Sequence, residues 1–297
     1  MPVFRFQAWL LVAAVALSAC NGPTRDIKSR VALRDDFGTE IALGQRPKRI
    51  VSLNPTTTEL LFAIGASDRL VGRSQWDVFP DSARFIPDVG QALRPNVEAI
   101  IAARPDLVLL YASADNRAAF DRLRQVGIPT VAFRIDSIAH FERDTRLIGR
   151  MTGDSARADA LVDSVHATLE RVRSATATLR RPSVFIHAWD RPIIAIGGGS
   201  FLSQLLDIAG GRNVYADIAG PSATVTLEDV IQRNPDYVFA SPVSAPKMRS
   251  SASWKTVPAV REGRLLVYDT VLVGRPSVML GAAAVSMANL LHPGSVR

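Results

Sequence analysis

Cysteine is almost absent from this sequence of 297 residues, in which Cys20 stands alone. Without a second cysteine there can be no intramolecular disulfide, no cysteine-based zinc site and no CxxC redox pair. The fold must therefore be stabilised by its apolar core. The composition allows a sizeable core, because 47% of the residues are hydrophobic and only 21% are charged.

Recognisable catalytic motifs are also missing. The four histidines are scattered, and the sequence contains no HExxH, no GxSxG and no GxxxxGK[ST]. We therefore expect no catalytic residues and no metal site, and an extracytoplasmic α/β enzyme stays only as an alternative. The stretch Gly197 to Ser200 resembles a phosphate loop but lacks its lysine. We interpret it as a tight turn with Ser200 as a helix cap, whose backbone N–H groups could also face a ligand.

The net charge is +7, but the basic residues form no stripe with interleaved aromatic residues. A nucleic-acid partner is therefore not expected. An anionic ligand, an anionic lipid surface and an ordinary arginine-rich surface all fit this charge.

The most apolar run, 8–17, is too short to span a bilayer and has the proportions of a signal-peptide core. It ends in Leu-Ser-Ala-Cys, which resembles the lipobox of bacterial lipoproteins. We predict a signal peptide over 1–19, lipidation of Cys20 and a polar tether over 20–30. The protein would then be periplasmic and anchored to a membrane through its lipid. An ordinary signal peptide with a chance cysteine is the alternative.

Apolar runs with turn residues between them predict alternating strands and helices. Such alternation indicates a mainly parallel α/β sheet. Strands are expected at 50–53, 70–74, 107–111, 130–135, 183–189, 193–196, 237–240 and 265–268, with two further short strands around a turn at 35–38. Helices are expected at 57–64, 96–103, 116–126, 201–209, 227–233 and 277–291.

Two further patterns suggest two similarly built lobes. The segment 96–110, NVEAIIAARPDLVLL, aligns with 226–240, TLEDVIQRNPDYVFA, although Pro-Asp between a helix and a strand also arises by chance. Between the halves, apolar residues at helical spacing predict one long helix over 154–181. We therefore expect an N-terminal α/β lobe at 31–153, a bridging helix, and a C-terminal lobe at 182–297.

Ligands of doubly wound sheets bind beyond the carboxyl ends of the strands. The aromatic residues at such ends include Trp76, Tyr111 and Trp189, and alternation would place Trp189 on the same strand face as His187. As a set they favour a cleft for a large, flat, partly apolar molecule, while packing under a loop is the alternative for each of them. The stretch NPTTTE at 54–59 joins a strand to a helix, and we expect one of its threonines to cap that helix.

Several stretches in order resemble one family. RIVSLNPTTTELLFAIG, FPDSARFIPDVG, VEAIIAARPDLVLLY and GGGSFLSQLLDIAGG are similar to the periplasmic binding proteins that serve ABC importers of cobalamin, haem and ferric siderophores, and most similar to the cobalamin branch. The resemblance implies two doubly wound Rossmann-like α/β lobes bridged by a rigid helix, with the ligand in the cleft between them. It implies a monomer without catalytic activity and without a covalent cofactor other than the lipid.

By this resemblance the ligand is a corrinoid, which carries cobalt, or an iron chelate, and it passes to a permease dimer in the inner membrane. The expected ligand-binding residues are Asn54, Thr56, Thr57, Trp76, Tyr111, Trp189, Asp269, Thr270 and Arg275. For haem, Tyr111 or His187 would be the iron ligand, and Arg94 or Arg275 would meet anionic groups of haem or a siderophore.

The sequence departs from the family at the positions that meet the permease. Where the family often has one acidic residue on each lobe, Arg117 and Leu272 stand here, with Asp115 as a substitute for one of them. Gln91-Ala92 and Thr270 replace aromatic residues that a cobalamin binder can carry. A non-transport sensor with the same fold is therefore a further alternative.

Overall fold

The first sheet consists of four short apolar strands, and all of its strand pairs are parallel. Its order is β2-β1-β3-β4, with β1 at Ile50–Leu53, β2 at Leu70–Arg73, β3 at Leu107–Tyr111 and β4 at Thr130–Phe133. The structure, a computed structural model, describes residues 33–41 and 45–296 as well as Met1. Helices follow the strands: α1 (Pro55–Ala63), α2 (Val97–Ala102) and α3 (Arg117–Gln125), with 3₁₀ turns at Ser67–Arg69, Asp81–Phe85 and Ala114–Asn116.

The second sheet is mixed. Its order is β10-β9-β5-β6-β8, and β7 pairs with β5. The bounds are β5 Ser183–Asp190, β6 Ile193–Ile196, β7 Arg212–Asn213, β8 Ser222–Thr224, β9 Tyr237–Ala240 and β10 Leu265–Val267. The strands β10, β9, β7 and β5 are parallel, whereas β6 runs antiparallel to β5 and β8. The helices are α6 (Phe201–Ile208), α7 (Leu227–Arg233), α8 (Ser244–Ser250), α9 (Pro258–Arg261), α10 (Thr270–Val273) and α11 (Leu280–Leu291), with a 3₁₀ turn at Trp254–Thr256.

The predicted α/β class is confirmed, and the predicted strands of both sheets are present with small shifts at their ends. The antiparallel β6 follows from the two-residue connection Arg191-Pro192, which is too short for a parallel crossover. The short strand β8 and the helices α8 and α9 carry little apolar sequence, and α10 has only four residues, so none of them was predicted.

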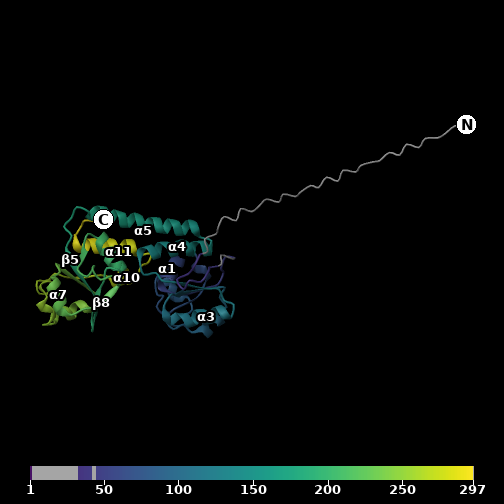
Figure 1. Cartoon of the computed structure of the whole chain (residues 1–297), viewed down its shortest axis with the longest axis horizontal. Helices are drawn as coiled ribbons and strands as arrows, with labels where there is room; N and C mark the ends of the chain where they lie inside the picture. The colour runs from purple at the N-terminus through teal and green to yellow at the C-terminus, as the bar shows by residue number, and fades with distance from the viewer. Residues whose placement is uncertain (2–32, 42–44, 297) are drawn as a thin grey trace. The chain divides into compact units, whose positions relative to one another are not determined.

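The long helix is confirmed as α5, Ser155–Thr176. Its buried stripe, Ala158, Val162, Val165, Leu169 and Val172, is the one expected from helical spacing. The predicted helix is too long at its carboxyl end, because residues after Thr176 turn away. Figure 1 shows α5 beside α4 (Ile138–Thr152) and α11, and it also packs against α6. Because α4 follows the first sheet and α6 and α11 belong with the second, α5 contacts both halves; its role as a rigid bridge stays a prediction.

The crossing of α4 and α5 depends on a glycine. A Cβ atom placed on Gly149 would lie 2.4 Å from the Cβ of Ala158 in α5. Any side chain at position 149 would therefore push the two helices apart. Helix α4 was not predicted, because Gly149 and the buried Asp144 interrupt its apolar pattern.

The repeated Pro-Asp segments form the same local structure. In each, a capped helix is followed within two residues by a residue with positive φ, Arg104 at 47° and Asn234 at 43°, before the strand begins. The following aspartate then accepts backbone N–H groups at the start of the neighbouring strand. Asp106 accepts from Lys48 and Arg49 at 2.8 and 2.9 Å, and Asp236 accepts from Ser183 at 2.7 Å. The alignment of the two segments thus reflects one structural unit used twice.

The described residues from Leu33 onward belong to one compact unit. Its largest apolar cluster includes Leu60 and Phe133 of the first half, Leu169 of α5, and Ile186 and Leu205 of the second half. The proposed lobe boundaries stay a prediction. The predicted signal peptide, the lipidated Cys20 and the tether over 20–30 lie outside the described residues. No helix in the described part of the chain is both long and apolar enough to cross a membrane.

Candidate functional site

The carboxyl ends of the first four strands meet at one edge of the sheet, because all are parallel. Asn54 follows β1, the turn that carries Trp76 follows β2, and Tyr111 ends β3. The structure therefore brings three of the predicted ligand residues to the same edge. This is the edge at which ligands of such sheets bind.

Asn54 begins α1 as its N-cap. Its side-chain oxygen accepts the backbone N–H of Thr56 at 3.1 Å, and Pro55 fills the first turn. The expectation that a threonine caps this helix is therefore wrong. The backbone of Asn54 is extended, at φ −137°, and this conformation places its side-chain amide at the free N–H groups of the first turn. The Nδ2 group of Asn54 is buried and has no hydrogen-bond partner among the described residues.

The three threonine hydroxyls after Asn54 are buried and bonded within the protein. Thr57 donates to the carbonyl oxygen of Asn54 at 2.9 Å. Thr58 donates to Asp77 Oδ2 at 2.8 Å, and Thr56 donates to the carbonyl oxygen of Pro276 at 3.1 Å. The start of α1 thus connects two segments that are remote in sequence. Whether Thr56 and Thr57 also contact a ligand stays a prediction.

The turn that carries Trp76 is stabilised by hydrogen bonds to the side chain of Asp77. This buried carboxylate accepts the backbone N–H of Ser74 at 3.1 Å, the Ser74 hydroxyl at 2.8 Å and the Thr58 hydroxyl. Burial raises the pKa of Asp77 to about 6, although its hydrogen bonds act in the opposite direction. Trp76, on the same turn, is 63% exposed. The structure therefore presents an apolar ring to solvent on a firmly held turn.

Trp189 is the exposed indole of the second half. It lies on β5, pairs with Ile194 of β6 and is 62% exposed. His187, two residues earlier, is fully buried and meets Trp254 edge-on at 5.6 Å between ring centres. The prediction that both residues share a strand face is wrong, because the register of β5 against β6 shifts between them.

The buried imidazole of His187 is held neutral. Burial lowers its pKa, and the carboxylate of Asp190, 3.2 Å away, only partly opposes this.

The other predicted residues of the second half lie in one segment after β10. Asp269 caps the short helix α10 by accepting the N–H of Val271 at 2.8 Å, and Thr270 is its exposed first residue. Arg275 follows α10, and its Nε donates to Glu59 Oε1 of α1 at 2.8 Å. The segment 269–276 therefore meets the start of α1, close in the fold to Asn54.

Tyr111 is half-buried, and its hydroxyl donates to Asp136 Oδ1 at 2.8 Å. Burial and this hydrogen bond raise the pKa of Tyr111 to about 12. The phenol is therefore protonated at neutral pH and serves as a donor.

The glycine-rich turn forms no phosphate loop. Ser200 caps α6, as predicted, by accepting the N–H of Leu202. The N–H groups of the three glycines donate to the carbonyl oxygens of Pro221, Ile218 and Gly220. A Cβ atom on any of the three would lie 2.2 to 2.3 Å from a backbone oxygen. These glycines thus allow two backbones to approach closely, and their donors are not available to a ligand.

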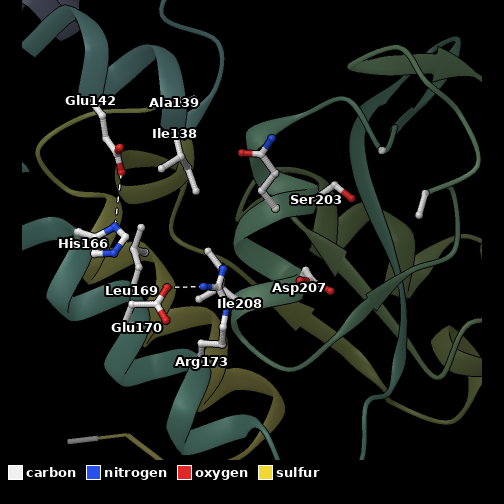
Figure 2. A pocket seen from close by; sticks show the side chains of 13 residues that line it. Ile138, Ala139, Glu142, His166, Leu169, Glu170, Arg173, Ser203, Asp207 and Ile208 are labelled. Atoms are coloured by element: carbon white, nitrogen blue, oxygen red, sulfur yellow. Dashed lines mark hydrogen bonds and ion pairs between the residues drawn. The ribbon is translucent and has the colours of Figure 1, made fainter.

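A cavity of about 560 Å³ lies between α4, α5 and α6, and Figure 2 shows the side chains around it. Two pairs of side chains line it: His166 Nδ1 lies 3.7 Å from Glu142 Oε1, and Arg173 pairs with Glu170. A second cavity, of about 650 Å³, lies near the amino ends of β3 and β4 and is lined in part by Lys48, Asp106 and Thr130. None of the predicted ligand residues lines either cavity. Within the described residues, no cluster of His, Cys, Asp or Glu could hold a metal ion.

Comparison with known proteins identifies the family. The family model described as periplasmic binding protein matches residues 50–272. The chain belongs to the periplasmic binding protein family. It is 28% identical to a Bacillus subtilis protein named uncharacterized ABC transporter substrate-binding lipoprotein YvrC, over 98% of this chain and 97% of that one. It is 30% identical to a cobalamin-binding protein of Halobacterium salinarum, over 87% of this chain and 73% of that one.

The fold agrees with solved structures of this family. The crystal structure of the periplasmic vitamin B12 binding protein BtuF of Vibrio cholerae matches with a TM-score of 0.72 at 22% identity, covering 82% of this chain and 96% of that one. This periplasmic binding protein therefore belongs with the substrate-binding proteins of ABC transporters, and its relatives include proteins named cobalamin-binding. Proteins of this class deliver their ligand to a membrane permease and are not enzymes.

The positions expected to meet the permease are accessible to different degrees. Arg117 begins α3, is exposed and pairs with Asp121 of the same helix. Leu272 is half-buried in α10, and Asp115 is exposed in the 3₁₀ turn before α3. An acidic group is therefore present beside Arg117, while the described neighbours of Leu272 within α10 are apolar or neutral.

Proposed function

We propose that this periplasmic binding protein captures a corrinoid, cobalamin in the first instance, and passes it to an ABC importer. The observation that carries the proposal is the pair of exposed indoles, Trp76 and Trp189, one on each half and each at a strand end. A corrin ring is large, flat and partly apolar, so it suits two aromatic faces. The name of the Halobacterium relative supports the same ligand.

The remaining contacts of this proposal are polar. At the edge of the first sheet, the Nδ2 group of Asn54 offers a donor, while Tyr111, whose O–H is bonded to Asp136, offers its ring and an acceptor oxygen. Asp269 and Thr270 offer side chains from the segment after β10, and Arg275 offers only the N–H donors that its pair with Glu59 leaves unused. Thr56 and Thr57 complete the proposed set. No group of the protein needs to coordinate the metal, because affinity would come from stacking and hydrogen bonds to the periphery of the chelate.

Haem is the alternative within the same family, and two observations count against it. An iron ligand from this chain would be Tyr111 or His187. The Tyr111 phenol is bonded to Asp136 and has a raised pKa, which opposes the phenolate that iron prefers. His187 is fully buried and could reach an iron atom only after β5 rearranged.

A ferric siderophore is the second alternative. Such a chelate is often anionic, so its binding would need arginine side chains that are not already paired. Arg94 is exposed and could meet such a ligand. Arg275, the other candidate, is already paired with Glu59. A siderophore carboxylate would have to compete with that buried pair, so the chain is less suited to it.

Titration calorimetry of the purified protein with cyanocobalamin, haemin and a ferric hydroxamate tests the proposal. We expect saturable binding of cyanocobalamin, and weaker binding after Trp76→Ala or Trp189→Ala. Losing one stacked indole removes on the order of 100 Å² of apolar contact, worth about 2 kcal/mol, so the Kd should rise roughly 30-fold.

Phe85→Ala is the matched control, because Phe85 is an exposed aromatic residue outside the proposed set. It should leave the Kd unchanged. Haemin binding with a shifted Soret band, together with silence toward cyanocobalamin, would refute the corrinoid proposal. Tight corrinoid binding without stimulation of any co-expressed importer ATPase would favour a sensor over a transport protein.

We further propose that Cys20 carries a lipid that holds the protein at the membrane near the importer. The lipobox-like Leu-Ser-Ala-Cys and the name of the Bacillus relative, a substrate-binding lipoprotein, support this anchor. On the importer side, Asp115 stands beside Arg117 and would supply the acidic contact of the first lobe.

A further inference from the structure

Two contacts tie the start of α1 to the segment after α10. Arg275 Nε donates to Glu59 Oε1 at 2.8 Å, and its Nη2 contacts the same oxygen. The Thr56 hydroxyl donates to the carbonyl oxygen of Pro276 at 3.1 Å. The partners are more than 200 residues apart in the sequence, and they belong to the first and second halves of the fold.

In the Glu59–Arg275 pair the glutamate is buried, whereas the arginine is partly exposed to solvent. The Glu59 side chain is 1% exposed, whereas that of Arg275 is 31% exposed. Burial raises the pKa of Glu59, and the charge and hydrogen bond of Arg275 oppose the rise. A buried carboxylate that loses its only cationic partner is strongly disfavoured. Glu59 therefore holds Arg275 firmly, and with it the backbone on either side.

The segment that Arg275 holds carries two of the proposed ligand residues. Asp269 and Thr270 open α10, which has only four residues and two exposed side chains, Thr270 and Val271. So short a helix has little stability of its own. Within the segment only Val273 and Pro276 are buried. Contacts with α11 and the attachment to α1 therefore fix its position together.

The same part of α1 braces the other side of the proposed site. Thr58, one residue before Glu59, donates to Asp77 under the Trp76 turn. Two adjacent residues of one helical turn thus hold a ligand-facing turn of the first half and a ligand-facing segment of the second. A shift of either attachment would change the spacing between Trp76 and Thr270.

We infer that Glu59 is a positioning residue for ligand binding: by holding Arg275 it fixes the segment 269–276 against α1, so that the groups of both halves are correctly spaced before a ligand arrives. This inference rests on the proposed function for the role of Trp76 and Thr270, but the attachment itself does not depend on the identity of the ligand. Preorganisation of this kind lowers the cost of binding.

Hydrogen exchange of the ligand-free protein tests the attachment. In Glu59→Gln the amides of Val271 and Val273 should exchange at least 10-fold faster than in the wild type. Arg275→Gln should give the same increase, and the double variant should add little, because both changes break one contact. Arg275→Lys keeps a cation beside Glu59 and should restore part of the protection. Glu98→Gln, an exposed acid of α2, is the matched control and should change nothing.

Calorimetry with cyanocobalamin then tests the role in binding. Glu59→Gln should raise the Kd for cyanocobalamin about 10-fold. Urea unfolding of the same variant should show that it is fully folded in the calorimetry buffer. Thr56→Val, which removes the hydroxyl bond to Pro276, keeps the test open if Glu59→Gln does not fold. Because Thr56 also belongs to the proposed ligand set, this variant is read by hydrogen exchange of the ligand-free protein, where Val271 and Val273 should exchange faster than in the wild type.

Unchanged exchange at Val271 and Val273 in a folded Glu59→Gln variant would overturn the inference. Faster exchange with an unchanged Kd would overturn the positioning role. If the wild type does not bind cyanocobalamin but the exchange of 270–274 still depends on Glu59, the attachment is supported and the proposed ligand is refuted.

Discussion

The replacement of Asp77 by asparagine gives the sharpest test of how the Trp76 turn is held. Asp77 is 1% exposed, and its carboxylate lies among three donors from Ser74 and Thr58. Burial raises its pKa from 3.8 to about 6. The folded protein therefore binds a proton on Asp77 more tightly than the unfolded chain does. The stability contributed by this protonation is full below pH 4 and is lost as the pH rises through about 6.

The magnitude follows from the two pKa values. Each pH unit between them is worth about 1.4 kcal/mol, so Asp77 should lower the free energy of unfolding by about 3 kcal/mol between pH 4 and pH 7. Asp77→Asn has no proton to lose at this site. The difference in unfolding free energy between the variant and the wild type should therefore shift by about 3 kcal/mol in favour of the variant over this range.

Urea unfolding at half-unit steps from pH 4 to pH 8 measures this difference. Asp144 also has a pKa raised to about 6 and adds a slope of the same sign, but it is present in both proteins and cancels. Asp81→Asn, in the exposed turn that follows Trp76, is the matched control and should run parallel to the wild type. Parallel pH profiles for Asp77→Asn and the wild type would refute the reasoning.

Three further predictions concern the fold and the anchor. Asp106→Ala and Asp236→Ala each leave strand-end N–H groups without an acceptor, and each should lower the unfolding free energy by about 1–3 kcal/mol, with nearly additive effects in the double variant; strong coupling in the urea data would contradict the separate roles of the two units. Gly149→Val should cost about 2 kcal/mol or more by forcing α4 from Ala158, and an unchanged thermal midpoint would argue against a tight crossing. Cys20→Ser should move the protein from the membrane fraction to the soluble fraction, and continued membrane association would disprove the lipid anchor.

Much of the fold could be predicted because its signals are local. The strands β1, β3 and β9 are short apolar runs bounded by proline, aspartate or asparagine, and their predicted bounds agree with the structure. The helix α4 could not be predicted in the same way. Its Gly149 weakens the local helical signal, yet the residue is required by the approach of α5, which is a tertiary contact that no sequence window contains.

The site was predictable as a set of positions but not as a set of contacts. The strand-end rule placed Asn54, Trp76 and Tyr111 on one edge. It could not show that the Thr56 hydroxyl is bonded to Pro276, since the partner is 220 residues away. It also placed His187 and Trp189 on one face, because strict alternation does not foresee the shifted register that buries one ring and exposes the other.

The hydrogen bonds accepted by Asp106 and Asp236 lie at the amino ends of the strands, whereas Trp76, Tyr111 and Trp189 lie at or beyond the carboxyl ends. The groups that secure the sheets are therefore separated by the full length of a strand from the groups that we propose meet a ligand. The exposed indoles at this edge, Trp76 and Trp189, can be exchanged without breaking the aspartate contacts. Asn54 and the threonines of α1 must be kept, because Asn54 caps that helix and the threonines are bonded within the protein. A scaffold built in this way can change its cargo by substitution at one rim, which makes it a practical starting point for engineered binders of other flat chelates.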